Sequence, residues 1–473
     1  MEYRIPILAA ATVAEMMTFT RFVGLPSGRM LAWASAGLFA VNWLLMLLYL
    51  VAIYPVYFSP LRNVPGPKGG HWLLGNFKLI HDSEPPYPQA AWMMDNPDAP
   101  IIRYRGLFNI ERIMLCSIES LRQILQTNTY EFPKPEELRK NGARILGMGV
   151  LFAEGAEHRR QRKALMPAFS FVHIKSLVPY FWDKSNTLVE CLQSELNTSG
   201  DGIVIEMQSW LTKATLDIIG VTGFGFDFDS LHRETEVVQA YNIILMPTSM
   251  YTRVLGILNG MIPIMQYVPL KRNLEVRQAI KSIHKICDEM IEEKMQRVKS
   301  GNTVGDDILA IIASQGEFTK REMREQVMTF LVAGHETTAT ATTWALHFLS
   351  KYPEMQHRLR EEVNGALADV KGPPTFDTID KLTYLAHFTQ EVLRYMPPVA
   401  VTFRESSKDC VIEGYSVPKG TTIIIANAAI QKDERLWGPT AKQFDPDRWV
   451  NPPESNYAFS AFLNGPHGCI GRK

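Results

Sequence analysis

The chain has 473 residues, and its 49 Lys and Arg are balanced by 49 Asp and Glu. This balance, together with the lack of a basic, aromatic-rich run in the sequence, argues against nucleic acid as a partner. The five cysteines lie far apart and form no Cys-x-x-Cys pair, which disfavours a disulfide framework or a zinc site. The hydrophobic content of 46% is sufficient for one large enzyme or for several ordinary domains.

The N-terminal region contains an uncharged apolar stretch, residues 31–58, which exceeds the roughly 20 residues that span a bilayer. Trp33 and Tyr54 lie near its ends, where amphipathic rings prefer the headgroup zone, and Pro55 is a helix breaker. We therefore expect a transmembrane anchor over residues 31–54.

The segment before this anchor, residues 1–30, includes a shorter apolar run over residues 5–19 that contains Glu15. This run is compatible with a second span, a half-inserted segment or an amphipathic helix. After the anchor, residues 55–70 contain Pro60, Pro65 and Pro67. Prolines at this spacing predict an extended, semi-rigid hinge.

The remaining chain, residues 71–473, has the pattern of one large domain that is mainly α with small β-sheets. Short β-branched runs predict strands that begin near Ile101, Glu111 and Thr421. Apolar residues recur at helical spacing over three long stretches, residues 277–298, 320–349 and 353–367.

One predicted helix, residues 319–350, contains the sequence LVAGHETTATATTW. Its apolar face is interrupted by Glu336, Thr337 and Thr338. Threonine hydroxyls compete for backbone carbonyls, so this part of the helix is expected either to open around a small ligand or to be simply back-bonded.

A possible charge network joins two later segments. Glu391 and Arg394 are three residues apart on one helix face, and Arg448 follows in a proline-defined loop. These three side chains are expected to form a network if the fold brings them together; otherwise the first two form an exposed pair of small energetic value.

A third motif, in the sequence AEGAEHRRQRKALMPAF, places His158 and Arg162 four residues apart on one helix face. The pair is suited to bind an anion. A solvated basic face is the alternative.

The sequence FLNGPHGCIGRK places Cys469 among Gly465, Gly468 and Gly471. These glycines allow the backbone to approach the sulfur closely. A lone thiolate without further Cys or His ligands suits an axial ligand of haem iron. The alternative is an inert core cysteine beside a turn.

Taken together, and in this order along the chain, these motifs resemble those of the cytochrome P450 family of haem-thiolate monooxygenases, in the style of its membrane-anchored fungal members. The sequence around Cys469 is similar to the family's haem-binding loop, the one around Glu336 and Thr337 to its oxygen-binding helix, and Glu391, Arg394 and Arg448 to its structural network. The resemblance implies the cytochrome P450 fold behind an N-terminal transmembrane helix.

The chain departs from the family pattern at two positions. His467 stands where an arginine is common, and His158 stands where a tryptophan is frequent. The resemblance implies that both histidines contact the haem propionates, together with Arg162 and Arg404. It also implies that Cys469 binds the iron of haem b.

By the same resemblance, Thr337 holds dioxygen and water, Glu336 relays protons, and electrons come from NADPH through NADPH-cytochrome P450 reductase. The implied reaction inserts one oxygen atom into a hydrophobic small molecule at the endoplasmic reticulum membrane, with the catalytic domain in the cytosol. Residues 241–270 would cap the active site near the lipid bilayer. We favour specialised metabolism, with fatty-acid or xenobiotic hydroxylation as alternatives.

Two further hypotheses remain at this point. One is a haem isomerase or dehydratase that needs no external oxygen, although such relatives often lack the threonine found at position 337. The other follows from the end of the chain shortly after Cys469, which the resemblance identifies as a C-terminal truncation lacking a final helix and hairpin. In that case we expect poor haem retention or an inactive haem-binding fragment.

Overall fold

The structure, a computed structural model, describes residues 4–23, 28–83, 87–199, 202–245, 251–252, 255–256, 259, 263–300 and 307–472. Within these residues the chain is mainly helical with small β-sheets, as predicted. Two compact units are distinguished, Met1–Ser120 with Lys408–Ile424, and Leu121–Ser407 with Ile425–Lys473.

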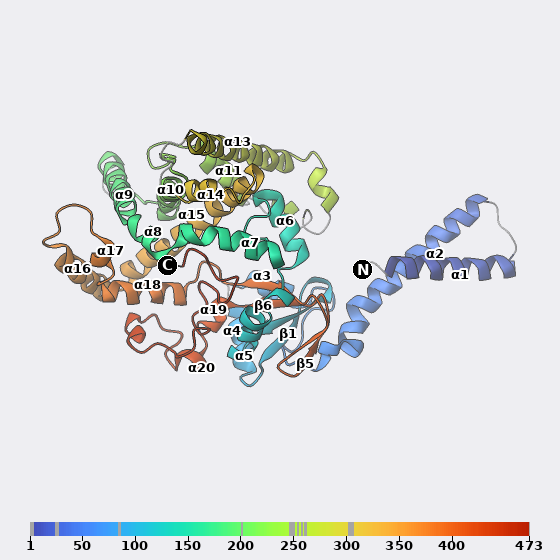
Figure 1. Ribbon diagram of the computed structural model, residues 1–473. Helices are drawn as coiled ribbons and strands as arrows, with labels where there is room; N and C mark the ends of the chain where they lie inside the picture. Colours follow the sequence, from blue (N-terminus) through green and yellow to red (C-terminus); the bar gives the residue numbers. More distant parts are fainter. Residues whose placement is uncertain are drawn as a thin grey trace. The chain divides into compact units, whose positions relative to one another are not determined.

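The first unit begins with two apolar helices, α1 (Arg4–Val23) and α2 (Gly28–Leu48), which pack side by side (Figure 1). Asn42 of α2 donates a hydrogen bond to Glu15 Oε2 of α1 at 2.7 Å and another to Thr12 Oγ1 at 3.3 Å. Polar side chains on two packed apolar helices typically form hydrogen bonds with each other in this way, because their apolar neighbours offer them no partner. The run around Glu15 is therefore a helix paired with α2.

The predicted anchor is longer in the structure than residues 31–54. Helix α2 continues as a π-helical segment, η1 (Tyr49–Phe58), and Gly28–Phe58 is the one helix among the described residues that is long and apolar enough to cross a membrane. Pro55 lies inside η1 and does not end it. The wider turn, in which Ser59 N donates to Tyr54 O at 2.9 Å, accommodates the proline ring.

The proline-rich segment that follows is structured and bonded to the rest of the first unit. Pro60 begins a short 3₁₀ turn, η2 (Pro60–Asn63), a position where a missing N–H does no harm. Arg103 N donates to Pro65 O at 2.7 Å, and Ser59 Oγ donates to Glu111 Oε1 at 2.8 Å. Asn109 Nδ2 reaches back to Val51 O at 2.9 Å.

Three predicted strands form the sheet of the first unit. The antiparallel strands β1 (Ile101–Arg105) and β2 (Glu111–Leu115) pair with Ile101 opposite Leu115, and β6 (Thr422–Ile425) runs parallel to β2 with Ile423 opposite Ile113. The unit also contains a small antiparallel hairpin and three short helices: β4 (Cys410–Ile412), β5 (Tyr415–Val417), α3 (Phe77–Asp82), α4 (Tyr87–Asp95) and η3 (Leu107–Asn109).

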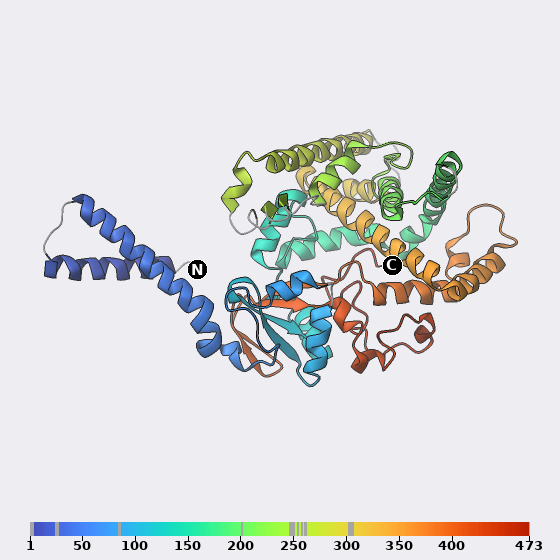
Figure 2. The same cartoon turned by 180° about the vertical axis from the view of Figure 1, so that it is seen from behind.

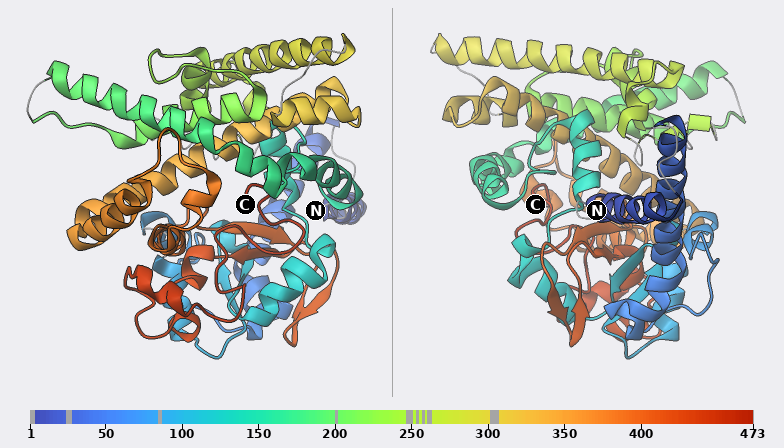
Figure 3. Two further views of the ribbon diagram at one scale, coloured as in Figure 1. Left: turned by 60° about the vertical axis from the view of Figure 1, so that its left-hand side comes forward. Right: turned by 90° about the vertical axis from the view of Figure 1, so that its right-hand side faces the viewer.

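The second unit is built around the long helix α15 (Lys320–Lys351), which crosses the unit as a long ribbon (Figures 2 and 3). The helix begins at a capping box formed by Thr319 and Glu322. The predicted helices over residues 277–298, 320–349 and 353–367 are confirmed. The other elements, with α5 at the junction of the two units, are α5 (Ile118–Arg122), η4 (Gln123–Thr127), η5 (Thr129–Glu131), α6 (Glu136–Leu146), α7 (Gly155–Leu165), η6 (Met166–Phe169), α8 (Phe171–Ser176), α9 (Val178–Ser199), α10 (Met207–Ile219), η7 (Gly220–Phe224), α11 (Glu236–Leu245), η8 (Pro263–Tyr267), α13 (Lys271–Lys299), α14 (Ile308–Gln315), α16 (Pro353–Leu367), α17 (Phe376–Ile379), α18 (Thr383–Tyr395), β3 (Thr402–Glu405), α19 (Asn427–Ile430), α20 (Glu434–Trp437) and η9 (Pro446–Val450).

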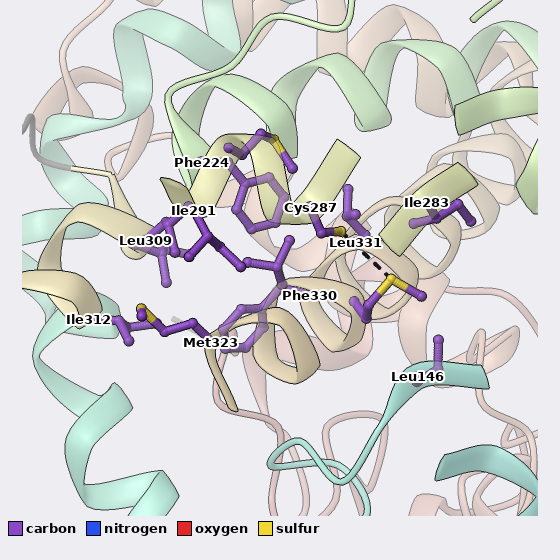
Figure 4. Packing of buried hydrophobic residues seen from close by; sticks show 14 of the residues in the cluster. Leu146, Phe224, Ile283, Cys287, Ile291, Leu309, Ile312, Met323, Phe330 and Leu331 are labelled. Atoms are coloured by element: carbon purple, nitrogen blue, oxygen red, sulfur yellow. Dashed lines mark hydrogen bonds between the residues drawn. The ribbon is translucent and has the colours of Figure 1, made fainter. Parts of the chain in front are cut away.

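The main hydrophobic core packs the first half of α15 against α13 and α14 (Figure 4). Ile283, Cys287 and Leu331 are fully buried in this core, where Cys287 Sγ lies 3.7 Å from Met328 Sδ. Burial raises the pKa of the Cys287 thiol to about 12, so this cysteine is an inert packing residue. The predicted cap over residues 241–270 falls partly outside the described residues.

Candidate functional site

The cysteine loop lies in the second unit and depends on one glycine for its shape. Gly465 has φ +74°, and a Cβ atom at this position would collide with the backbone carbonyl of Leu125. The turn is closed by Gly468 N donating to Gly465 O at 2.9 Å, and Cys469 N donates to Phe462 O at 2.7 Å. Gly471 is less constrained, because the nearest atom to an added Cβ is a Phe169 ring carbon at 3.9 Å. Of the two, only Gly465 is required by sterics.

The Cys469 side chain is exposed. Protein atoms around the thiol nevertheless desolvate it and raise its pKa. A hydrogen bond from the Gly471 backbone N–H acts in the opposite direction, as do the positive charges of Arg162 and Arg472. The local N–H donor and the two cations therefore stabilise the thiolate. Because the pKa remains raised, a stronger electrophile is needed for the thiolate to exceed the thiol at neutral pH.

Helix α7 lies beside the cysteine loop and supplies the predicted pair, His158 and Arg162 (Figure 1). Arg162 Nη1 donates to Gly468 O at 2.7 Å and so holds the loop directly. His158 is 1% exposed, and its ring stacks on that of His467 with centroids 3.9 Å apart. The alternative of a solvated basic face is wrong for His158. Tyr130 Oη lies 3.2 Å from His158 Nδ1 and completes this contact.

A buried cation-rich cluster surrounds the two histidines. Arg404 on β3 is 1% exposed and donates through Nη1 to Phe403 O at 2.7 Å. Lys134 donates its backbone N–H to Glu154 Oε1 at 2.9 Å, and its ammonium lies 3.5 Å from the same oxygen. His467 Nε2 is 3.4 Å from Glu154 Oε2. Glu154 is the single carboxylate within this group, which we call the cation cluster (Lys134, Glu154, His158, Arg162, Arg404 and His467).

The titration behaviour of the cluster reflects burial and crowding of positive charge. Desolvation, followed by the charges of Lys134 and its neighbours, lowers the pKa of His158 to about 4 and that of His467 to about 2. Desolvation and the charge of Arg404 lower the pKa of Lys134 to about 8. Both histidines are thus neutral at physiological pH, where each imidazole offers one N–H donor.

Helix α15 supplies the two predicted catalytic residues, Glu336 and Thr337. The helix is continuous here, and the predicted local opening is not seen. Thr337 Oγ1 donates to Ala333 O at 2.6 Å and Thr338 Oγ1 donates to Gly334 O at 2.8 Å, which is the back-bonded alternative. No hydrogen bond or ion pair joins Glu336 or Thr337 to the cysteine loop within residues 307–472.

The predicted charge network is present and buried. Glu391 and Arg394 are both fully buried and form a two-pronged pair, with Nε to Oε2 and Nη2 to Oε1 both at 2.7 Å. Arg448 Nε lies 3.1 Å from Glu391 Oε1, and Trp449 Nε1 donates to Glu391 Oε2 at 3.0 Å. Arg394 also donates to the backbone carbonyls of Gln431, Ala441 and Gln443. This network is structural, because every N–H donor of the Arg394 guanidinium group is directed at an acceptor of the protein.

The cation cluster differs from that network in having unused donors. Arg404 Nη2 is buried and has no hydrogen-bond partner among the described residues, and His467 Nε2 is buried and lies 3.4 Å from Glu154 Oε2 without forming a hydrogen bond to it. Buried polar atoms without partners are uncommon and call for an explanation. A ligand bearing two carboxylates would supply acceptors and would balance the excess of cations over Glu154. A haem propionate pair, with the iron near the exposed Cys469, satisfies this chemistry, so the residues fit a haem group. The site is that of a haem-thiolate protein.

Comparison with known proteins agrees with this class. The model of the family described as Cytochrome P450 matches residues 64–473, and the chain belongs to that family. It is 37% identical over 444 residues to "Cytochrome P450 monooxygenase sphH" of Aspergillus fumigatus, an alignment that covers 90% of this chain and 82% of the relative.

Two other fungal relatives show the same pattern. The chain is 37% identical to "Cytochrome P450 monooxygenase FUM15" of Gibberella moniliformis, with 89% of this chain and 81% of the relative covered. It is 31% identical to "Cytochrome P450 monooxygenase buaD" of Petromyces alliaceus, with 97% and 84% covered. The protein is therefore an oxidoreductase of the monooxygenase class, as predicted.

Sequence reasoning missed three members of this site. Tyr130 lies in the short helix η5, Lys134 in the loop after it and Glu154 directly before α7, and none of these positions carries a periodic or spacing signal in the sequence. Only the excess of cations at His158 and Arg162 hinted that a carboxylate was needed nearby. The stacking of His158 on His467 was also not predicted, although both residues were assigned to the same ligand.

Proposed function

We propose that the protein is a membrane-anchored haem-thiolate monooxygenase that oxidises a hydrophobic small molecule of specialised metabolism. The observation that carries this proposal is the buried donor Arg404 Nη2, which has no hydrogen-bond partner among the described residues and belongs to the cation cluster beside the cysteine loop. Cys469 is assigned as the axial iron ligand, and His158, Arg162, Arg404 and His467 as the residues that hold the propionates. Haem b, when bound, supplies oxygen activation.

The residues of the chain orient this chemistry and control its protons. Arg162 fixes the loop through Gly468 O, and the Gly471 N–H and nearby cations stabilise negative charge on Cys469. Thr337 already donates its proton to Ala333 O, so its lone pairs are left to accept a hydrogen bond from water or substrate. Glu336 is 34% exposed, which allows its carboxylate to exchange protons with solvent and pass them inward.

The cellular setting is part of the same proposal. The apolar helix Gly28–Phe58 supports membrane anchoring. The fungal origin of all three relatives cited above supports a role in specialised metabolism. We propose the endoplasmic reticulum membrane as the location, with the catalytic domain in the cytosol and NADPH-cytochrome P450 reductase as the electron donor.

The test is the carbon monoxide difference spectrum of the reduced protein and of Cys469→Ser. We expect a thiolate-type Soret band for the unsubstituted protein and its loss in the variant, because a serine hydroxyl cannot replace the thiolate. Absence of the band in both proteins would contradict the proposal and favour an inactive haem-binding fragment. Product formation without NADPH and dioxygen would instead favour an isomerase or dehydratase.

A further inference from the structure

The second unit contains a cavity whose lining shares no residue with the cation cluster. This cavity of about 910 Å³ lies beside α6, α11 and α13. Small-molecule sites commonly have volumes of about 300–1,000 Å³, so the cavity is large enough for a ligand. Its described lining includes four cationic side chains, Arg144, Arg272, Arg277 and Lys281, and no aspartate or glutamate.

This excess of positive charge is local. The whole chain has equal numbers of acidic and basic residues, and cations elsewhere on α13 and α15, such as Arg297 and Arg324, are paired with the carboxylates of Glu293 and Asp288. Here the pairing groups are neutral. Arg144 donates to the side-chain oxygen of Gln266, and Arg277 Nη2 donates to the backbone oxygen of the same residue at 2.7 Å. Two guanidinium groups thus share one uncharged residue.

The electrostatic consequence appears at Arg144. Its pKa is lowered, first by burial and further by the positive charge of Arg277, while Tyr267 acts in the opposite direction. Arg272 donates to Ile243 O, which is also neutral. A smaller cavity on the other side of Arg144 contains Glu325, but that carboxylate is already paired with Arg321 at 3.0 Å. The charge in the main cavity therefore remains uncompensated by the residues that line it.

The rest of the cavity wall is apolar. Ile145, Ile244, Val276 and Ile280 contribute aliphatic surface beside the cations. A ligand that satisfies both parts has an anionic head and an apolar tail. We propose that this cavity binds the anionic group, a carboxylate or phosphate, of a small amphiphile, through Arg144, Arg272, Arg277 and Lys281. This assignment names a substrate class for the proposed monooxygenase and to that extent rests on the proposed function.

Binding is tested on the full chain in phosphatidylcholine nanodiscs, by displacement of a fluorescent acyl probe with dodecanoate, dodecanol and dodecyltrimethylammonium. We expect dodecanoate to bind about tenfold or more tightly than dodecanol, because hydrogen bonds to charged groups are stronger than neutral ones. The cation should bind weakest, and high salt should reduce the preference for dodecanoate. Equal affinity for dodecanoate and dodecanol would overturn the proposal.

Variants of α13 provide the matched comparison. Arg277→Ala and Lys281→Ala are each expected to lower the affinity for dodecanoate about tenfold and to leave dodecanol unchanged. Lys285→Ala is the control, because Lys285 is an exposed cation on the same helix, as Arg277 and Lys281 are, but pairs with Glu289 and does not line the cavity. An equal loss in Lys285→Ala would show a general effect of surface charge and would overturn the assignment.

Flotation with vesicles distinguishes a free amphiphile from a lipid headgroup. If Arg277→Ala and Lys281→Ala weaken binding to phosphatidylserine vesicles but leave dodecanoate binding intact, the cations serve the membrane surface and the proposal fails. The carbon monoxide spectrum of the same samples separates the two proposals. A thiolate band without a preference for dodecanoate contradicts this inference alone, and the preference without a band contradicts the proposed function alone.

Discussion

Two clusters of buried arginines in the second unit contrast in how their donors are used. Arg394 directs its guanidinium group at Glu391 and at three backbone carbonyls. Arg404 is buried equally deeply, yet one of its terminal nitrogens has no partner among the described residues. Burial alone therefore does not distinguish a structural arginine from a ligand-binding one. The number of unused donors does.

The largest effect on stability should come from breaking the charge network of Glu391, Arg394 and Arg448. Glu391→Ala leaves Arg394 buried without its carboxylate and removes the acceptor of Arg448 and Trp449. We expect a loss of about 3–5 kcal/mol in the free energy of unfolding. Thermal and urea unfolding measure it. The control is Glu361→Ala, which removes an exposed partner of His357 and should cost less than about 0.5 kcal/mol. Similar losses in both variants would show that the network is not structural.

A smaller loss of stability is expected from a substitution in the cysteine loop. Gly465→Ala places a side chain on a residue with φ +74° and against the Leu125 carbonyl. We expect the free energy of unfolding to fall by at least about 2 kcal/mol and the thiolate Soret band to be lost. Gly471→Ala is the matched control in the same loop, because its added Cβ meets only a Phe169 carbon at 3.9 Å. Stability and Soret band should survive in that variant. Equal damage from both substitutions would contradict the role given to Gly465.

Lys432, whose pKa is affected by Arg394 of the charge network, predicts a dependence of stability on pH. Burial, and then the charge of Arg394, lowers the pKa of Lys432 from 10.5 to about 8. Between pH 8 and 10.5 the unfolded chain holds this proton and the folded chain does not, so stability rises with pH across that window. After allowance for partial solvent screening, the gain is about 1–2 kcal/mol. Urea unfolding of Lys432→Met should lack this rise, and an unchanged pH profile would refute the assignment.

The smallest effect on stability should come from a substitution in the cation cluster. Arg404→Met removes a buried charge that protein does not fully pair, so the haem-free protein should change by no more than about 1 kcal/mol and in the stabilising direction. Haem titration followed at the Soret band should show about tenfold weaker binding, because one charged donor is lost. Large destabilisation of the haem-free protein, with haem affinity preserved, would mean that Arg404 is structural like Arg394.

The sequence predicted the parts of the fold that have a local period or a fixed spacing. Strands at Ile101 and Glu111 and the helix around Glu336 were found because alternation and helical periodicity reflect which face is buried. The joining of Glu391 to Arg448 could be expected from their residue types but needed the fold for proof. Lys134 and Glu154 could not be found, because loop residues that meet only in three dimensions leave no pattern along the chain.

The back-bonded threonines of α15 show a second limit. Weak helix propensity around Thr337 left both a local opening and simple back-bonding as alternatives, and the structure has the back-bonded one in a continuous helix whose first half packs in the main core. Tertiary packing commonly overrides such preferences. The helix likewise continues past Pro55, because the proline fits inside a π-helical turn that the sequence does not reveal.

The hydrogen bonds at the base of that anchor have a mechanical meaning. Arg103 contacts Pro55 O, Asn109 binds Val51 O, and Ser59 binds Glu111, so the last turns of the apolar helix are bonded to the β1–β2 hairpin. In the proposed membrane anchoring, a loose tether would let this sheet rotate freely above the bilayer. A fastened helix would act as a lever instead, and its tilt in the lipid would set the inclination of the sheet of the first unit relative to the membrane plane.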